Sequence, residues 1–458
     1  MGDEVDAMLA TVRKRVTPDD EQRVALEAVA TEVRQRAEAA VEELSVDAEV
    51  VQVGSTARNT WLPEDRDIDV FVCFPTELTR DELEAYGLEV GHAVLPNGRE
   101  EYAEHPYVVG SVDGYDVDLV PCYAVESATA IESAVDRTPF HTRYVEDRLA
   151  AAEGSAETLA DDIRVLKAFL TAIGVYGSDL KTRGFSGYLT ELLVLEYGSS
   201  RAVLEAAANE WSPPVRIDPE DHGQQTFDDP LVVIDPTDPE RNVAAVLHAD
   251  SLARFQHHAR AVLADPSEDQ FTPTETAPLS DEAAEQFFAD RATTPVAVVF
   301  AAPDIVDDQL WPQLWRSLAG IERELDRRGF APLRSAAFAE DRAVLFVECA
   351  VAELPAVERH EGPPVHVGEH ARSFYEKYAA DEDVTGPYIE DGRYVVERER
   401  RFRTPEAFLA SEAIFEVALG KTVEEALRAE YSVLSGRDVA TLADEFGTQL
   451  AAYADPKP

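Results

Sequence analysis

A glycine–serine pair and two alternating aspartates, set a fixed distance apart, constrain the fold of this chain more than any other feature. Gly54-Ser55 is separated by eleven residues from Asp67-Ile68-Asp69, and the aspartates lead into the apolar stretch Val70–Phe74. β-Branched and aromatic residues in such a stretch predict a central strand over 67–74. Side chains two residues apart on a strand lie on one face, about 6.6 Å from each other. We therefore expect Asp67 and Asp69 to share one face of a sheet.

Two carboxylates so placed repel each other unless a cation lies between them. Magnesium favours oxygen ligands and usually keeps waters and substrate phosphates in its coordination shell. Asp118 lies in a second apolar stretch and supplies a third carboxylate from an adjacent strand. The three acids predict a two-metal Mg²⁺ site that activates a hydroxyl and stabilises pyrophosphate as it leaves. Asp65 and Asp116 share the alternation, but Asp67 and Asp118 lie better against the apolar stretches.

The residues ahead of the predicted strand suit phosphate binding. Gly54 permits a close backbone approach, and the Ser55 hydroxyl, with amides ahead of a helix, can hold a phosphate. The alternative is that the three aspartates are surface acids, because a chain with 90 Asp and Glu residues contains D-x-D patterns by chance. The apolar stretch directly behind the acids, with Gly-Ser ahead at loop distance, favours metal ligation.

The formal net charge of −49 taken alone argues against a nucleic-acid partner, which normally needs a basic surface. The acids are, however, spread over every segment, and six lysines stand against 35 arginines, as in proteins of salt-loving archaea. In molar salt the Debye length falls to about 3 Å, so distant carboxylates hardly repel RNA. The net charge therefore indicates a high-salt solvent and says nothing about the partner.

Several absences in the sequence point to a soluble, cytoplasmic protein. No apolar run approaches the roughly 20 residues of a membrane helix, and the acidic N-terminus lacks a signal-peptide core. Cys73, Cys122 and Cys349 have neither CxxC nor zinc-site spacing, so we expect buried, reduced cysteines. Acidic surfaces do not forbid apolar interfaces, and a homodimer stays compatible with this composition.

Hydrophobic periodicity and turn signals predict an α+β chain of more than one domain. Helical segments are expected over 1–45 with a start at 17–20, over 81–92, over 144–197 with breaks at Gly174 and Gly184, and over 242–263. Strands are expected over 50–53 and 67–74, with a hairpin of 107–112 and 115–120 around Asp113-Gly114. Residues 209–238 are expected to form loops or short strands, and residues 265–278 a linker. Beyond the linker we expect a strand over 296–300, a helix over 311–328, a strand over 342–349 and a second hairpin over 388–403.

With these motifs the sequence resembles the DNA polymerase β-like nucleotidyltransferase superfamily, and more closely the archaeal (class I) CCA-adding enzymes of halophiles. The matching strings are Gly54–Leu62, Asp67–Phe71, Tyr102–Tyr107, Val117–Tyr123, Asp136–Thr142, Gly174–Gly177, Arg183–Tyr188, Asp235–Asp238 and Arg241–Ala245. The sequence departs from many relatives at Asp67, where a glutamate is expected. Aspartate keeps the charge, so we expect the same chemistry.

The resemblance implies a catalytic nucleotidyltransferase domain over 1–142, with a mixed sheet and helices. It further implies a mostly helical, nucleotide-binding central domain over 143–265 and an α+β tRNA-binding domain over 266–458. The implied activity is template-independent addition and repair of the 3′-terminal CCA of tRNA, from CTP and ATP with release of pyrophosphate. The alternatives are a poly(A) polymerase-type RNA-tailing enzyme, a catalytically silent tRNA-binding module and a small-molecule nucleotidyltransferase.

Roles at the predicted site follow from the resemblance. Asp67 and Asp69 would hold both magnesium ions, and Asp118 would join them at the metal that activates the primer 3′-hydroxyl. The residues that would contact the nucleotide are Ser55, Arg58, Thr138, His141, Lys167 and Tyr176 at the triphosphate and ribose, Tyr102 and Ala103 beside the nucleotide or primer end, and Arg241 at the base.

Five of these assignments have an alternative that the sequence leaves open. Lys167 could be a surface lysine, and Tyr102 and Ala103 could serve packing. His141 could be a structural histidine. Arg241 could form a helix-start salt bridge with Asp238 or Glu240.

The C-terminal part is expected to hold the acceptor stem and T-arm of tRNA by shape and backbone contacts. The densest basic cluster of the chain consists of Arg398, Arg400, Arg401 and Arg403, and these are the candidate RNA-binding residues. The alternative is an exposed arginine face balanced by Glu397 and Glu399.

Overall fold

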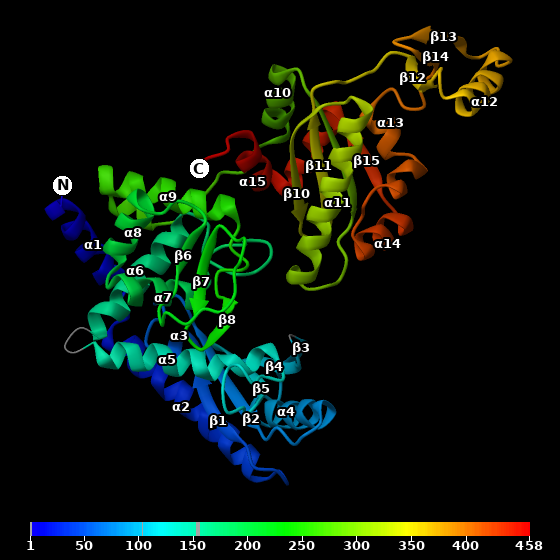
Figure 1. Cartoon of the computed structure of the whole chain (residues 1–458). Helices are drawn as coiled ribbons and strands as arrows, with labels where there is room; N and C mark the ends of the chain where they lie inside the picture. Colours follow the sequence, from blue (N-terminus) through cyan, green and yellow to red (C-terminus); the bar gives the residue numbers. More distant parts are fainter. Residues whose placement is uncertain (1, 103, 153–155) are drawn as a thin grey trace. The chain divides into compact units, whose positions relative to one another are not determined.

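The computed structural model describes residues 2–102, 104–152 and 156–458 (Figure 1). Packing divides the chain into two compact units, Met1–Thr274 together with Pro458, and Glu275–Lys457. Each unit combines helices with sheets and has its own apolar core, so the expected α+β, multidomain architecture is confirmed. The boundary falls inside the expected linker 265–278, although Phe271 still packs into the core of unit 1. The finer division of unit 1 at residue 142 stays a prediction.

A five-stranded sheet of order β1-β2-β5-β4-β3 occupies the N-terminal part of unit 1. Its strands are β1 (Glu49–Val53), β2 (Asp67–Phe74), β3 (Arg99–Tyr102), β4 (Pro106–Val112) and β5 (Tyr115–Tyr123). β2 and β5 pair in parallel, and the other neighbours are antiparallel. The predicted strand 67–74 and the hairpin at Asp113-Gly114 are confirmed, and both turn residues have positive φ angles, as a tight hairpin turn requires.

Two long helices pack on one face of this sheet (Figure 1), and part of the opposite face is buried in a smaller apolar cluster around Phe71 and Cys122. The first helices are α1 (Gly2–Val16), α2 (Asp20–Glu42), the short α3 (Gly54–Ala57) and α4 (Arg80–Val94). α2 begins at a capping box in which Asp19 and Gln22 bond each other's backbone. Apolar residues of α2 and α4 pack on Ile68, Val70 and Val72, whose side chains alternate with Asp67 and Asp69 along β2. The acids therefore lie on the face opposite to these helices.

The rest of unit 1 is mostly helical, with a small sheet of order β6-β7-β8. Its elements are η1 (Ala134–Arg137), α5 (Thr138–Ala151), α6 (Ala156–Ala172), α7 (Gly187–Tyr197), α8 (Ser200–Asn209), β6 (Val215–Ile217), β7 (Leu231–Asp235), β8 (Asp238–Asn242), α9 (Ala249–Ala264) and η2 (Glu268–Phe271). The prediction of a helix from residue 242 is wrong at its start, because the Asn242 side chain accepts the Val233 N–H and holds β8 against β7. Arg241 consequently lies on a strand, and the helix begins where His248 caps it.

Unit 2 contains a four-stranded sheet, β10-β11-β9-β15, and a three-stranded sheet, β12-β14-β13. Its elements are α10 (Asp281–Arg291), β9 (Thr294–Ala301), α11 (Asp307–Arg328), β10 (Pro332–Ala339), β11 (Arg342–Cys349), β12 (Val357–Pro364), α12 (Gly368–Ala379), β13 (Thr385–Glu390), β14 (Arg393–Glu399), α13 (Pro405–Leu409), η3 (Glu412–Glu416), α14 (Lys421–Ala429), β15 (Ser432–Ser435), η4 (Gly436–Leu442) and α15 (Ala443–Ala454). The predicted strand–helix–strand is β9, α11 and β11, and the predicted second hairpin is β13–β14.

The three cysteines are buried and free, as expected. None of the helices in the described part of the chain is long and apolar enough to cross a membrane.

Two leucines of unit 2 provide a matched test of its core. Leu314 is fully buried on α11, whereas Leu333 on β10 is 51% exposed. We expect Leu314→Ala to lower the opening free energy of unit 2 by about 2–5 kcal/mol, and Leu333→Ala to change it by no more than about 0.5 kcal/mol. Native-state hydrogen exchange of amides in β9 and β11 measures this energy for unit 2 itself. Equal losses in both variants would contradict the core described here.

Candidate active site

The parallel pairing of β2 with β5 brings the predicted metal ligands together on one face. Asp69 lies directly opposite Asp118, and Asp67 lies opposite Asp116. The pKa of Asp69 is raised to about 7, first by burial and then by Asp118 and Asp67. The pKa of Asp118 is raised to about 6, first by burial and then by Asp67. The three acids thus share one region of negative potential.

The two acids that the sequence disfavoured are placed differently. Asp65 lies before β2, where its carboxylate accepts the Leu62 N–H at 3.2 Å. Asp116 is exposed beside Asp67 at the first register position of β2 and β5. Burial and the charges of Asp65 and Asp116 raise the pKa of Asp67.

The face of the sheet that carries Asp67, Asp69 and Asp118, called the acid face below, suits a hard divalent cation. All of its donors are carboxylate oxygens, and their mutual repulsion is the kind that a bound cation relieves. Within residues 2–102, 104–152 and 156–458, no three Asp, Glu, His or Cys side chains are grouped so that they could hold a metal ion. An open carboxylate face of this kind matches magnesium, which is usually held by one or two carboxylates together with waters and substrate phosphates.

Gly54 brings the chain against the acids in a way that only glycine permits. Its φ angle is +78°, and a Cβ atom placed on it would lie 2.0 Å from Oδ2 of Asp69. The α3 turn that follows carries Ser55, whose carbonyl accepts the Thr60 N–H at 2.9 Å. The spacing of Gly-Ser to the aspartates therefore reflects direct contact between the turn and the acid strand.

Two predicted phosphate ligands, Arg58 and Lys167, are held by one buried glutamate. Glu191 accepts from Arg58 Nε at 3.1 Å, lies 3.0 Å from Arg58 Nη2 and 3.9 Å from Lys167 Nζ, and also accepts the Thr60 hydroxyl. Lys167 Nζ donates to the Thr60 carbonyl at 2.9 Å. The alternative that Lys167 is a surface lysine is wrong, because its side chain is fully buried.

Sequence reasoning missed Glu191. It is fully buried on α7, where it stands as the one acid within the apolar stretch Leu189–Leu195. Lys167 and Arg164 interrupt the apolar helical stretch Ile163–Leu170, and the same kind of signal marks Glu191. Burial lowers the pKa of Lys167 to about 8 in spite of the opposing charge of Glu191.

A second buried carboxylate, Asp235 at the end of β7, gathers two more predicted residues. It accepts from His141 Nε2 and from Arg241 Nη1, each at 2.8 Å. His141 also stacks on Tyr188 with ring centroids 4.1 Å apart. The proposed salt bridge of Arg241 with Asp238 or Glu240 is therefore wrong, since its partner is Asp235. Asp238 pairs instead with Arg137.

Arg241 lines a cavity of about 760 Å³. The polar side chains of this cavity include Arg137, Gln224, Gln225 and Asn242, and Phe227 adds an aromatic surface. Hydrogen-bond donors and acceptors beside an aromatic ring are the groups that recognise a nucleobase.

The remaining predicted nucleotide contacts lie around these clusters. Thr138 is the first residue of α5, three positions before His141. The Tyr176 hydroxyl lies near the Glu191 cluster, because a Cβ atom on Gly187 would meet both this hydroxyl and Lys167 Nζ. Burial, followed by the charges of Asp65 and Glu191, raises the pKa of Tyr176. Tyr102 is 60% exposed at the end of β3, with its hydroxyl 3.2 Å from Arg80 Nη2, so core packing does not explain it. Ala103 lies outside the described residues.

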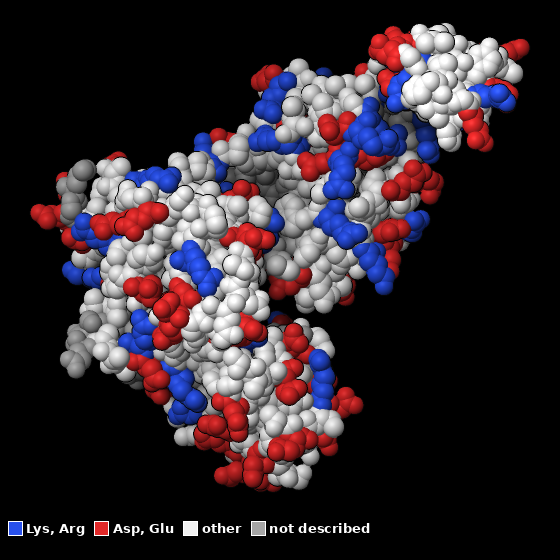
Figure 2. Space-filling model, in the orientation of Figure 1, with Lys and Arg blue, Asp and Glu red and all other residues white. Residues whose placement is uncertain are grey.

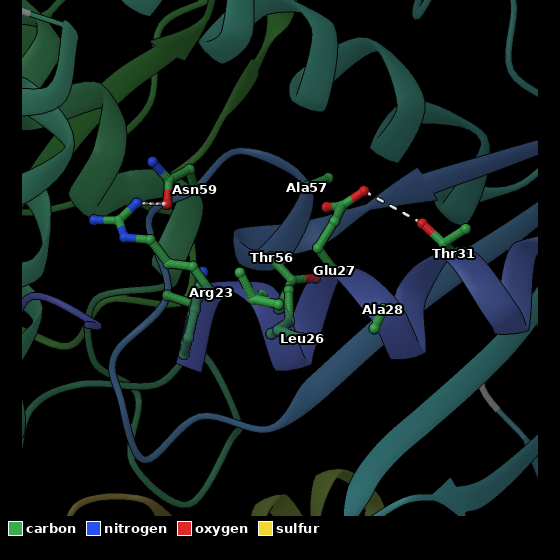
Figure 3. A pocket seen from close by; sticks show the side chains of 10 residues that line it. Arg23, Leu26, Glu27, Ala28, Thr31, Thr56, Ala57 and Asn59 are labelled. Atoms are coloured by element: carbon green, nitrogen blue, oxygen red, sulfur yellow. Dashed lines mark hydrogen bonds between the residues drawn. The ribbon is translucent and has the colours of Figure 1, made fainter. Parts of the chain in front are cut away.

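A different cavity, of about 670 Å³, lies between α2 and α3 (Figure 3). Arg23 reaches across it to Asn59 at 2.8 Å, and Thr31 bonds Glu27 along α2. None of its lining residues belongs to the predicted site. This groove is therefore distinct from the acid face.

The four candidate RNA-binding arginines lie in unit 2, where Figure 2 shows basic side chains gathered in a band among acidic ones. Each arginine faces a glutamate: Arg398 and Arg400 face Glu358, Arg401 faces Glu416, and Arg403 faces Glu353. The alternative of an arginine face balanced by acids differs only in its partners, which are these glutamates and not Glu397 and Glu399. Neighbouring residues on β14 point to opposite faces, and Arg398 pairs across the sheet with Glu358.

The mixed sheet, its paired aspartates and the Gly-Ser turn define a nucleotidyltransferase. Residues 34–141 match the family model "Nucleotidyltransferase domain", 161–272 match "tRNA nucleotidyltransferase, second domain", and 291–436 match "CCA-adding enzyme, C-terminal domain". The polymerase β-like class expected from the motifs is thereby confirmed. The chain is an enzyme that transfers nucleotides.

Similarity to curated proteins extends over the whole chain. The chain is 60% identical to the CCA-adding enzyme of Haloarcula marismortui, over 100% of both chains. It is 58% identical to that of Halobacterium salinarum strain R1, over 98% of this chain and 99% of the relative. It is 40% identical to that of Methanosarcina acetivorans, over 96% of each. The chain belongs to the family of CCA-adding enzymes, which are tRNA nucleotidyltransferases. The haloarchaeal relatives agree with the acidic composition.

Gly54 offers a test of the acid face with a matched control. In Gly54→Ala the new methyl group would collide with Asp69, and we expect kcat for nucleotide incorporation to fall about 100-fold or more. Gly198→Ala is the control, because Gly198 has a φ angle of +81° with no atom within 4 Å of its Cβ position. Both variants carry the same backbone strain, about 1–2 kcal/mol. Steady-state kinetics, with circular dichroism as a check on folding, should show activity lost in Gly54→Ala alone.

Proposed function

We propose that the chain adds and repairs the 3′-terminal CCA of tRNA without a nucleic-acid template, using CTP and ATP. In each step the tRNA 3′-oxygen bonds to the α-phosphorus, the bond to pyrophosphate breaks, and the hydroxyl proton is lost. Membership of the CCA-adding family supports the activity. The observation that carries the chemistry is the parallel register that sets Asp69 opposite Asp118, with Asp67 two residues away on the same face.

The chain's own residues divide the work at this site. Asp67, Asp69 and Asp118 would hold Mg²⁺, which when bound supplies positive charge at the reacting hydroxyl and at the leaving pyrophosphate. Arg58 and Lys167, gathered by Glu191, would bind the triphosphate. Burial strengthens these contacts, because ionic interactions are worth more where water is excluded.

Arg241, which lines the cavity of about 760 Å³, would select the base. Cytosine and adenine each present a ring nitrogen that accepts a hydrogen bond next to an amino group, whereas uracil and guanine present a carbonyl and a ring N–H. The Arg241 guanidinium can only donate. Together with RNA backbone groups that accept from the amino group, it would select cytosine and adenine without a template.

Unit 2 would hold the acceptor stem and T-arm of tRNA. The side chains of Arg398, Arg401 and Arg403 are about half exposed, and their glutamate partners are at least a quarter exposed. Exposed ion pairs are worth little, and less in high salt. Phosphate groups of RNA can therefore replace these carboxylates at small cost. A cytoplasmic location and a homodimer are part of the same proposal.

The activity is tested with purified protein in high KCl and magnesium, a tRNA that lacks its 3′ CCA, and each labelled nucleotide singly and together. We expect two C additions with CTP and one A addition once ATP is present. Asp69→Asn should abolish incorporation and leave tRNA binding intact, because it removes one negative charge from the acid face. Unlimited A addition to any RNA would replace the proposal with a tailing enzyme. Full turnover by Asp69→Asn would remove Asp69 from the metal site.

The pH dependence of nucleotide use tests the buried lysine. Lys167 is faced by Glu191 and Asp65, which favour its charged form, and by Arg58 and Arg164, which oppose it. Its pKa of about 8 means that it is charged below pH 8 and neutral above. We therefore expect log(kcat/KM) for CTP to fall as the pH rises through 8.

Substitution of Glu191 should lower the pH at which log(kcat/KM) begins to fall. Glu191→Gln removes the negative charge that favours the ammonium form, so the fall in log(kcat/KM) should begin at a lower pH. Glu196→Gln, on the exposed side of the same helix, is the control and should keep the wild-type profile. An unshifted profile in Glu191→Gln would separate Glu191 from Lys167.

A further inference from the structure

Asp235 is a fully buried carboxylate whose two oxygens have different partners. Oδ1 accepts the Thr237 N–H at 2.9 Å and the Thr237 hydroxyl at 2.8 Å, and it lies 3.4 Å from the Tyr188 hydroxyl. Oδ2 accepts from His141 Nε2 and from Arg241 Nη1, both at 2.8 Å. The Thr237 contacts fix the orientation of the carboxylate on the strand end. The position of Oδ2 is therefore fixed, and its hydrogen bond to Arg241 fixes the position of the guanidinium.

We propose that Asp235 is a specificity-determining positioning residue: it fixes the Arg241 guanidinium at the wall of the 760 Å³ cavity so that CTP and ATP are selected over UTP and GTP. The inference rests on the proposed function, since it assigns a partner to the residue that reads the base. Asp235 itself need not touch the nucleotide. It acts through the arginine that it holds.

Charge balance explains why the arginine stays in place. A buried carboxylate is costly unless it is paired and hydrogen-bonded. Burial lowers the pKa of His141 in spite of its hydrogen bond to Asp235. Although burial raises the pKa of Asp235, hydrogen bonds from His141 and Thr237 and the charge of Arg241 hold it well below its usual range. Arg241 is the cation in contact with Asp235. If Arg241 swung away, the buried negative charge would lose its counter-ion.

The contact with Asp235 also determines which donors face the cavity. A guanidinium is planar and carries five N–H groups in a fixed fork. The Nη1 bond to Asp235 engages one edge of the fork, while the side chain is about one third exposed and lines the cavity. The donors that face the cavity are therefore held in one direction. A donor fixed in direction penalises a ring N–H on the base, whereas a freely rotating one can turn away from it.

Asparagine at position 235 makes a selective test because the two partners of Oδ2 differ. With its oxygen kept on Thr237, Asp235→Asn would direct its amide N–H₂ at His141 and Arg241. Neutral histidine can change tautomer and accept this hydrogen bond. Arginine has no acceptor, so donor would face donor and Arg241 would be displaced. The substitution therefore releases the arginine while the local shape is kept.

The experiment measures kcat/KM for all four nucleotides on tRNA lacking CCA, in wild type and in Asp235→Asn. We expect the preference for CTP over UTP, and for ATP over GTP, to fall about 10- to 100-fold in the variant, which corresponds to the loss of one good base contact. Asp162→Asn is the matched control: Asp162 is a buried aspartate of the same unit, paired with Arg13 and Ser200 away from the cavity. It should leave the preference unchanged.

A double-mutant cycle shows whether the effect runs through the arginine. If it does, Asp235→Asn combined with Arg241→Ala loses no more preference than Arg241→Ala alone. Additive losses would overturn the inference, as would a wild-type preference in folded Asp235→Asn. Should Asp235→Asn not fold, Asp235→Glu keeps the charge but shifts it by one methylene, and an unchanged preference there would also overturn the inference. Failure of wild type to add C, C and A would instead refute the proposed function.

Discussion

The repulsion between carboxylates on two adjacent parallel strands is the constraint around which unit 1 is arranged. Asp69 and Asp118 are held opposite each other because Ile68, Val70, Val117 and Leu119 are completely buried on the other side of the same strands. The apolar underside stabilises the sheet, and this stabilisation keeps like charges together on the upper side. A strand slipped by one residue would turn the acids into the core. The charge cluster is thus tied to the register of the sheet.

The same unit uses carboxylates for a second purpose, to hold cations in buried positions. Glu191 gathers Arg58 and Lys167, and Asp235 gathers Arg241 with His141. In both clusters a fully buried acid is fixed by hydrogen bonds from hydroxyl or backbone groups, and it fixes a cation in turn. A chain with so many acids carries most of them on its surface. These two are among the few that are buried, and a buried carboxylate requires its partners whereas a solvated one does not.

Sequence reasoning succeeded where the signal was local. The bounds of β2 and β11, the hairpin at Asp113-Gly114 and the capped start of α2 follow from the order of residues within a few positions. It failed at β3, where the sequence Arg-Glu-Glu-Tyr carries no apolar alternation and pairing with β4 alone makes a strand. It also failed at the start of α9, where the side chain of Asn242 serves a strand.

The sequence by itself determined the enzyme class and the face that carries the acids, because these depend on side-chain type and on the two-residue period of a strand. Only the tertiary structure decided which acid meets which cation. Glu191 lies 133 positions from Arg58, and Asp235 lies 94 from His141. In unit 2, Arg398 pairs with Glu358 across the sheet and not with the glutamates beside it in the chain. With 90 acids available, composition cannot choose among partners, and the packing of distant elements makes the choice.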